Sequence, residues 1–236
     1  MKHADSLAGK VAIVTGAGDG IGRAVCLRLA LLGATVFGAS RREESLVQTS
    51  ELLRATGADG FLGVPTDVTQ EDQVCSLFAQ VAKSGPVDIL VNNAGAGIAA
   101  GLLDITLADW DAQMAVNARG VFLCSREAAR HMLPRGSGEI INLSSLAGKH
   151  ASAGFAAYVA SKHAAVGFTE AISRELRRSN IRITSLCPGA VATEMRRKAA
   201  PNENSANITQ PEQIATLIGF ILTEGAGMRD MGLDIF

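Results

Sequence analysis

The sequence predicts an α/β fold in which a doubly wound parallel sheet carries helices on both faces. Short apolar and β-branched runs alternate with longer segments whose apolar residues recur at helical spacing. The short runs are apolar almost throughout, which indicates strands that are buried on both faces, as in a parallel sheet. Because such sheets bind ligands beyond the carboxyl ends of their strands, functional residues are expected where these runs end.

Each expected element follows from one of these two patterns. The strands are expected at 11–16, 34–40, 59–67, 87–93, 138–145 and 181–189. The helices are expected at 20–32, 43–56, 70–83, 106–133, 155–178 and 211–222. The chain closes on GMRDMGLDIF, whose apolar residues can add a last strand, and the polar stretch 196–210 is expected to be a mobile loop. No linker or repeat divides the chain, so a single domain over 1–236 is expected.

The composition favours a small-molecule partner. Of the 236 residues 47% are hydrophobic, and the formal net charge of −1 leaves no basic surplus for nucleic acid or an anionic membrane. The N-terminal MKHADSLAGK lacks an apolar signal core, and no apolar run reaches membrane-spanning length. The four cysteines lack C-x-x-C spacing, which argues against a zinc site or a disulfide framework and fits a reducing compartment. A cytoplasmic protein without a metal site is therefore expected.

The first predicted strand runs into the glycine-rich segment TGAGDGIGRA, residues 15–24. A strand, a glycine turn and a helix start can bring backbone N–H groups and the positive helix end against a diphosphate. The common dinucleotide spacing G-x-G-x-x-G fails here, because it would require glycine at Ile21 or at Arg23. The residues that satisfy the spacing T-G-x-x-x-G-x-G instead are Thr15, Gly16, Gly20 and Gly22. At the first strand of a parallel sheet, this pattern favours cofactor binding over a purely structural turn.

A second motif pairs the only tyrosine of the chain with a lysine. In AYVASKH, residues 157–163, Tyr158 precedes Lys162 by four positions, so on a helix their side chains share one face. Taken alone, the pair favours an accidental meeting of an amphipathic tyrosine and a surface lysine. The other motifs of the chain decide between this reading and a catalytic role.

Together the motifs resemble those of the short-chain dehydrogenase/reductase family, in its compact single-domain branch, over nearly the whole chain. TGAGDGIG resembles the cofactor loop of that family, and NNAG at 92–95 resembles its fourth-strand motif. YVASK resembles its Y-x-x-x-K catalytic pair, and CPGAVATEM at 187–195 resembles its P-G-x-x-x-T segment. Four motifs in the order of the family are more specific than any one of them, and they favour a catalytic role for Tyr158 and Lys162.

The resemblance implies an oxidoreductase that interconverts a ketone or 3-oxo group and a secondary alcohol, with hydride from a nicotinamide cofactor. A nearby cation favours the ionised form of a phenol, and Lys162 can supply that cation and also bond the nicotinamide ribose. Tyr158 would then exchange a proton with the substrate oxygen. Ser145, thirteen positions before the tyrosine, matches the substrate-polarising serine, whereas Ser144 is expected to be structural. Asn117 matches the asparagine that holds a water in the proton relay.

The resemblance also indicates where the substrate binds. The segment between the catalytic serine and tyrosine borders the substrate pocket in relatives, and here it contains Leu146, His150, Ala151 and Phe155. An apolar pocket with one polar contact is therefore expected. The short stretch 190–210 is expected to form a small substrate-side loop.

The end of the second strand, FGASRRE, favours NADP(H), with NAD(H) possible. An acid at this strand end would bond the ribose hydroxyls of NAD, whereas this chain has Ser40 followed by Arg41 and Arg42. Arginine pairs bidentately with phosphate; the alternative is a solvated basic turn. Asp19 departs from the pattern, because NADP-preferring relatives often carry a basic residue at its position.

The resemblance assigns further cofactor contacts along the strand ends. Asp67 would contact the adenine, Val68 would add a backbone contact, and Thr193 would contact the carboxamide end. The full set of expected cofactor residues is Thr15, Gly16, Asp19, Gly20, Ile21, Gly22, Ser40, Arg41, Arg42, Asp67, Val68, Asn93, Ala94, Gly95, Tyr158, Lys162, Pro188, Gly189, Val191 and Thr193.

The expected partners are a small carbonyl or alcohol substrate and further copies of the chain. Long helices at 106–133 and 155–178 would leave apolar faces that need partners, so a homodimer or homotetramer is expected. Two other functions stay open: a catalytically silent NAD(P)-binding redox sensor or regulatory subunit, and an epimerase or dehydratase of the longer branch. The matching catalytic residues argue against the first, and the length and glycine spacing argue against the second.

Overall fold

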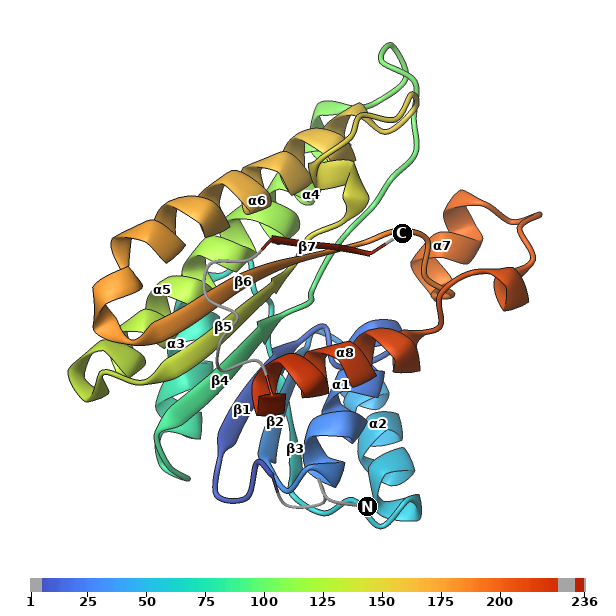
Figure 1. The fold of residues 1–236 in the computed structure, drawn as a ribbon. Helices are drawn as coiled ribbons and strands as arrows, with labels where there is room; N and C mark the ends of the chain where they lie inside the picture. Colours follow the sequence, from blue (N-terminus) through green and yellow to red (C-terminus); the bar gives the residue numbers. More distant parts are fainter. Residues whose placement is uncertain (1–5, 225–231, 236) are drawn as a thin grey trace.

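The computed structural model describes residues 6–224 and the backbone of 232–235. Seven described strands form one parallel sheet in the order β3-β2-β1-β4-β5-β6-β7 (Figure 1). They are β1 (Val11–Thr15), β2 (Thr35–Ser40), β3 (Phe61–Pro65), β4 (Val87–Asn92), β5 (Gly138–Leu143), β6 (Ile181–Pro188) and β7 (Gly232–Ile235). The chain builds the sheet outward from β1 in one direction and then from β4 in the other, which confirms the doubly wound fold.

Helices cover both faces of the sheet (Figure 1). Those described are α1 (Gly20–Leu31), α2 (Glu43–Ala55), α3 (Glu71–Val81), α4 (Leu107–Met114), α5 (Val121–Met132), α6 (Ala156–Glu175), α7 (Glu194–Ala199) and α8 (Pro211–Glu224). Helices α1, α2 and α8 pack on one face, and α3, α5 and α6 pack on the other. None of the described helices combines the length and the apolar character needed to cross a bilayer.

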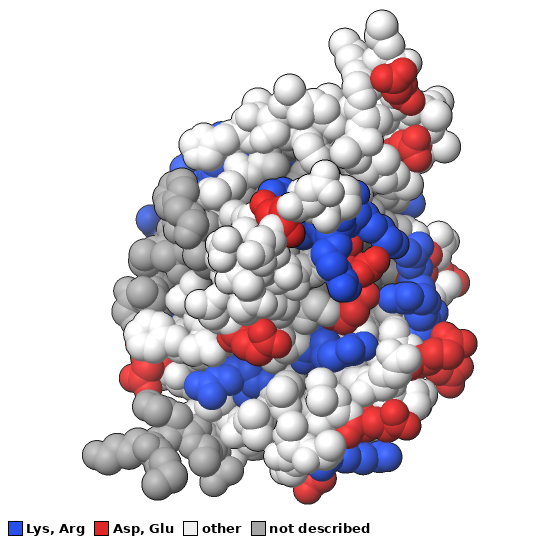
Figure 2. Space-filling model, turned by 90° about the vertical axis from the view of Figure 1, so that its right-hand side faces the viewer, with Lys and Arg blue, Asp and Glu red and all other residues white. Residues whose placement is uncertain are grey.

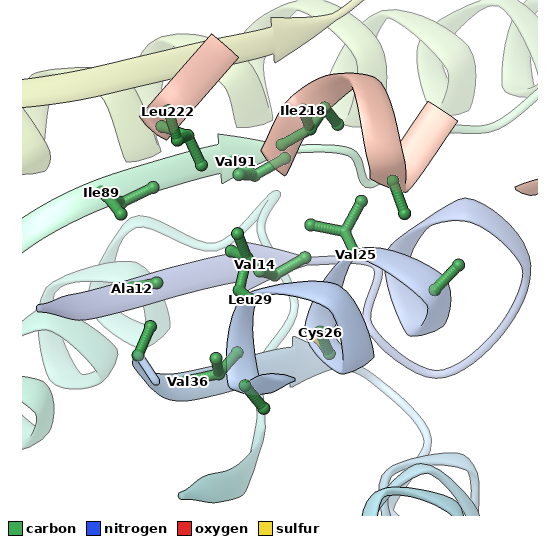
Figure 3. Close-up of a cluster of buried hydrophobic side chains, with 14 of the residues drawn as sticks. Ala12, Val14, Val25, Cys26, Leu29, Val36, Ile89, Val91, Ile218 and Leu222 are labelled. Carbon is green, nitrogen blue, oxygen red and sulfur yellow. The ribbon is translucent and has the colours of Figure 1, made fainter. Parts of the chain in front are cut away.

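The core consists of two apolar layers, one on each face of the sheet. On β1, Ala12 and Val14 point into a layer that contains Leu29 of α1 and Ile218 of α8 (Figure 3). The alternate residues Val11 and Ile13 point into the other layer, with apolar side chains of α3 and α5. Every residue of β1 is buried, which explains why the predicted strands are apolar almost throughout.

The predicted strands are confirmed, with small differences at their ends. The third strand is shorter than expected, because pairing with β2 covers only 61–65 of the predicted 59–67. The chain end supplies a further strand, since β7 pairs with β6. The other residues of GMRDMGLDIF, 227–231 and 236, lie outside the described residues.

The single regular helix predicted over 106–133 is wrong in its middle. The backbone there runs from α4 through a π-helical turn, Ala115–Gly120, into α5. The side chain of Asn117, in this turn, bonds both backbone polar groups of Ala96 on the neighbouring segment. A π turn widens the helix by one residue, and the residues buried in this turn are Asn117 and Gly120, so apolar periodicity does not reveal it.

The loop predicted over 196–210 is wrong in part, because it is organised by local pairs. Helix α7 continues to Ala199, and a 3-10 turn follows at Ser205–Asn207. Arg196 makes two bonds of 2.6 Å to the carboxylate of Glu203, which holds the helix against the segment after it. Val191 and Thr209 form a bridge that closes the base of the segment.

Candidate active site

The predicted functional residues gather at the carboxyl edge of the sheet. Thr15, Ser40 and Pro188 are the last residues of β1, β2 and β6, and Asn93 and Ser145 follow β4 and β5. This edge is on the right in Figure 1, where helix α7 lies. Figure 2 looks onto it and shows lysine and arginine side chains across its middle, interleaved with acidic side chains. The strands thus bring together residues that are far apart in the chain, as a doubly wound fold requires of its ligand site.

The glycine loop is a cradle that side chains would fill. Gly16 and Gly20 have φ angles of 67° and 47°, in the left-handed region that favours glycine. A Cβ placed on Gly22 would overlap the carbonyl oxygen of Gly16, so α1 begins in close contact with the preceding turn. Backbone packed this tightly at a helix start suits a diphosphate, so the residues present fit a dinucleotide cofactor. Ile21 packs inward against the core layer of α1.

The loop after β4 is fixed to the glycine loop by hydrogen bonds. Thr15 Oγ1 accepts from the backbone N–H groups of Asn93 and Ala94, at 3.0 Å each. The amide of Asn93 donates to the carbonyl oxygens of Thr15 and Gly16, at 2.9 and 3.2 Å. Four predicted cofactor residues therefore hold the glycine loop in shape, whatever contacts they make with a ligand.

Tyr158 and Lys162 lie on the first two turns of α6, one helical turn apart. The Lys162 side chain is 5% exposed, and its Nζ lies 5.7 Å from the centroid of the Tyr158 ring. Lys162 Nζ donates to the carbonyl oxygen of Leu143 at 3.2 Å, and no carboxylate of the described residues forms an ion pair with it. A buried cation without a carboxylate is costly, and its charge acts on whatever lies beside it. Tyr158 is half-buried.

The two serines after β5 have different environments. Ser144 is buried, and its hydroxyl donates to the carbonyl oxygen of Lys162 at 3.1 Å, so it joins the strand end to α6. Ser145 is half-buried, and its Oγ accepts from the N–H of Ala147 at 3.1 Å. Because Ser145 Oγ serves as an acceptor in that bond, its own proton can be donated to a substrate oxygen.

Asn117 is buried beside Lys162, and its side chain joins two segments of the chain. Its amide accepts from the N–H of Ala96 at 2.8 Å, and it donates to Ala96 O at 2.7 Å and to Ser161 Oγ at 2.9 Å. A Cβ on Gly95 would lie 3.4 Å from Asn117 Oδ1 and 3.7 Å from Lys162 Nζ, so these two side chains converge on one glycine. The side chain of Asn117 is committed to protein groups, so it fixes the loop after β4 to α6.

The end of β2 meets the glycine loop through small side chains. A Cβ on Gly18 would overlap the hydroxyl of Ser45 and lie 3.1 Å from Ser40 Oγ. Asp19, next in the loop, forms an ion pair with Arg42 at 3.1 Å, and both side chains are exposed. Arg41 is exposed as well.

The residues predicted to contact the adenine and the carboxamide of the cofactor follow strands β3 and β6, which lie on opposite sides of β1 and its glycine loop. Asp67 is half-buried and its carboxylate accepts from the N–H and hydroxyl of Thr69, at 2.9 and 2.8 Å, while Val68 is buried. Thr193 begins α7, and its methyl group would lie 3.0 Å from a Cβ on Gly20. The segment after β6 thus returns to the glycine loop, with Val191 buried beneath it.

The surroundings of Tyr158 are largely apolar. A Cβ on Gly97 would lie 3.2 Å from Met195 Sδ and 3.4 Å from the Tyr158 ring, so the three residues meet. The ring of Phe155 lies edge-on to that of Tyr158, with centroids 6.5 Å apart. His150 is exposed at the surface.

Sequence reasoning missed a buried polar network beneath the site. The amide of Asn92 donates to Ser125 Oγ at 3.0 Å and to Asn142 Oδ1 at 2.8 Å, and Asn142 donates to Thr169 Oγ1 at 2.9 Å. These four residues, from β4, α5, β5 and α6, are each at most 2% exposed. The signal was present, because an asparagine inside an apolar strand must find buried partners.

The ion pairs in and beside α7 were also not predicted from the sequence. The hydrogen bond to Arg196 lowers the pKa of the Glu203 carboxyl, and the same bond raises the pKa of the Arg196 guanidinium. Glu194 pairs with Arg197 and, at 3.9 Å, with Lys198. The spacing of three and four residues within RRK and its flanking acids could have indicated these pairs.

Comparison with known proteins gives consistent matches. A family model described as short chain dehydrogenase matches residues 10–204. The chain is 38% identical over 206 residues to gluconate 5-dehydrogenase of Gluconobacter oxydans, which covers 86% of this chain and 80% of that protein. A variant of actinorhodin polyketide ketoreductase with NADPH superposes with a TM-score of 0.90 at 32% identity, covering 98% of this chain and 97% of that one. A gluconate 5-dehydrogenase structure from Beutenbergia cavernae with bound NADP, described as putative, has a TM-score of 0.90 at 29% identity, covering 98% and 96%.

Proposed function

The chain belongs to the short-chain dehydrogenase family, and from that premise we propose that it interconverts a ketone or 3-oxo group and a secondary alcohol with NADP(H). The observation that carries the proposal is the pairing of Tyr158 with a buried Lys162 whose Nζ lies 5.7 Å from the phenol ring. A redox sensor does not need a buried cation without a carboxylate partner beside a phenol. An enzyme that transfers a proton from that phenol to a carbonyl oxygen does need it.

The residues of this chain then divide the work of the reduction. When bound, the cofactor supplies the hydride. Tyr158 donates the proton that the developing alkoxide takes up, and the Lys162 ammonium stabilises the phenolate that remains. The hydroxyl of Ser145 donates to the carbonyl oxygen and orients it. Asn117 positions Lys162 by fixing the segment around Ala96 to α6 through bonds of 2.7 to 2.9 Å.

The preference for NADP(H) is supported by the end of β2. Ser40 stands where an acid would repel a ribose 2′-phosphate, and the exposed guanidinium of Arg41 forms no ion pair with any carboxylate of the described residues. A free guanidinium can bind phosphate bidentately. The other cofactor contacts proposed are those of the glycine loop, of 93–95 and of 188–193.

The substrate side, formed by 190–210 and by the segment between Ser145 and Tyr158, favours a neutral and apolar substrate. Met195 meets the Tyr158 ring at Gly97, and the ring of Phe155 lies edge-on to that of Tyr158. Of the cations of α7, Arg196 is held by two bonds of 2.6 Å to Glu203, whereas Arg197 and Lys198 share the exposed carboxylate of Glu194. A sugar acid, the substrate in the name of one relative, would therefore find fewer suitable contacts here than an apolar ketone.

A panel of carbonyl compounds tests the proposal. Alicyclic and aromatic ketones, 3-oxoacyl thioesters, steroids and 5-ketogluconate are each incubated with the protein and NADPH, and NADPH consumption is followed by absorbance. We expect the highest kcat/KM with an apolar ketone or 3-oxoacyl thioester. NADPH binding without turnover of any compound would contradict the proposal and favour a sensor, and a highest kcat/KM for 5-ketogluconate would contradict the apolar substrate.

We also propose that the chain forms a homodimer or homotetramer through the face of α4 and α5. Leu107 is 74% exposed, and Trp110 and Phe122 are each 39% exposed, although large apolar side chains are usually buried. Light scattering at working concentration should give a mass of two or four chains. Phe122→Ser should shift that mass toward one chain, and a monomeric mass for the unmodified protein would contradict the proposal.

A further inference from the structure

The geometry points to Asp19 as the residue that limits the preference for NADPH over NADH, because its carboxylate holds Arg42 and competes with the ribose 2′-phosphate for that guanidinium. The inference rests on the proposed use of NADP(H). It concerns the strength of cofactor discrimination, which the proposed function leaves open.

The ion pair joins the two segments on which cofactor discrimination is expected to depend. Asp19 belongs to the glycine loop and Arg42 to the turn between β2 and α2, and Arg42 Nη2 lies 3.1 Å from Asp19 Oδ2. The neighbouring residue Gly18 packs against Ser45 and Ser40. Asp19 therefore places a carboxylate beside the end of β2, where Ser40 itself offers none.

The carboxylate of Asp19 is committed to Arg42 and not to its own helix. Asp19 occupies the N-cap position of α1, where aspartate usually accepts a bond from the backbone N–H groups of the first turn. Its side chain makes no such bond here. The side chain reaches instead across to a residue 23 positions away.

The two arginines after Ser40 are therefore not equivalent. Arg42 is neutralised by Asp19, whereas Arg41 forms no ion pair within the described part of the chain. The side chains of Arg42 and Asp19 are 70% and 57% exposed, so the pair is weak enough for a phosphate to displace it.

The experiment measures nucleotide binding to the whole chain without any reaction. The probes are 2′,5′-ADP, which carries the ribose phosphate, and 5′-ADP, which lacks it, each titrated by calorimetry. Asp19→Asn should tighten 2′,5′-ADP roughly three- to tenfold and change 5′-ADP less than about twofold, because only the first probe competes for Arg42. Asp59→Asn is the matched control, since it removes the same charge from an exposed position before β3.

A double substitution decides whether Asp19 acts through Arg42. In an Arg42→Gln background, Asp19→Asn should alter 2′,5′-ADP affinity by less than about twofold. A gain that persists undiminished in this background, or a gain as large in Asp59→Asn, would overturn the inference. Unchanged 2′,5′-ADP affinity in Asp19→Asn would also overturn it while leaving the proposed function intact. Failure of the unmodified protein to bind NADPH would instead refute the proposed function and this inference with it.

Discussion

The two halves of the carboxyl edge are built by different means. On the side of β1 and β2, the site is made of backbone and small residues: the glycine loop is shaped by Gly16, Gly20 and Gly22, and its charged residues are exposed. On the side of β4 and β5, the site is made of buried side chains that bond one another, including Asn92 and Asn142.

Because of this difference, the two halves are expected to be disrupted by different kinds of substitution. A glycine cradle is damaged by added atoms, because there is no room for a Cβ between closely packed backbone segments. A buried polar network is damaged by removed atoms, because each lost partner leaves a donor or acceptor without water or protein to bond. Substitutions of opposite kind therefore test the two halves, and the following outcomes are ordered from the largest expected effect to the smallest.

The largest effect is expected on the catalytic half, at Tyr158. Tyr158→Phe removes only the hydroxyl, so kcat on the best panel substrate should fall on the order of 10²- to 10⁴-fold, as for loss of a positioned proton donor. NADPH binding by fluorescence and the melting temperature should stay unchanged, since the ring and its contacts with Phe155 and Gly97 remain. Equal kcat values for the two proteins would refute the catalytic assignment.

On the cofactor half, Gly22→Ala should weaken NADPH binding by tenfold or more and lower stability by about 1–3 kcal/mol, because the new Cβ overlaps Gly16 O. Fluorescence titration and urea unfolding measure the two effects. The matched control is Gly167→Ala in α6, where a Cβ would meet nothing within 4 Å and which should cost neither binding nor stability. If the two variants behaved alike, the steric account of the glycine loop would be wrong.

Within the buried network, Asn142→Leu should lower the free energy of unfolding by about 1–3 kcal/mol, because it removes bonds to Asn92 and Thr169 in the core. Urea unfolding gives the value, and Asn202→Leu at an exposed position serves as the control, expected within about 0.5 kcal/mol of the unmodified protein. A loss no larger than that of the control would show that the network adds little to stability. NADPH affinity should change little, which separates this variant from Gly22→Ala.

The smallest effect concerns Glu139, at the amino end of β5 and thus opposite the site. Burial raises the pKa of its carboxyl above the ordinary value, although the bond to Arg182 acts the other way. A raised pKa means that the folded state holds the proton more tightly, so this contribution to stability is present below the ordinary pKa and is lost as pH rises through the raised one. Relative to the unmodified protein, Glu139→Gln should therefore gain stability between about pH 4 and pH 7. Urea unfolding across this range, with the exposed Glu51→Gln as control, checks it; a difference independent of pH would contradict the burial effect.

Much of the fold and part of the site followed from local sequence pattern. Buried strands carry apolar residues on both faces, so their positions could be read from composition along the chain, and every strand of the described residues was predicted, including the more exposed edge strand β3. The pairing of Tyr158 with Lys162 was predictable because four residues make about one turn of any α-helix. The glycine loop was predictable because left-handed φ angles such as those of Gly16 and Gly20 leave few alternatives to glycine.

Other features were decided only by contacts between distant segments. The π turn at Asn117 depends on Ala96, 21 residues away, and the clamp of Asn92 on Asn142 joins residues 50 apart. The Asp19–Arg42 pair likewise exists because two strand ends lie side by side in the folded sheet. Periodicity and propensity report the interactions of a residue with its neighbours along the chain, and hydrogen bonds and ion pairs across the fold leave no such local signature. The sequence alone therefore determined the architecture and indicated the proposed reacting groups, whereas the tertiary structure decided which side chains hold those groups in place and which arginine is already paired.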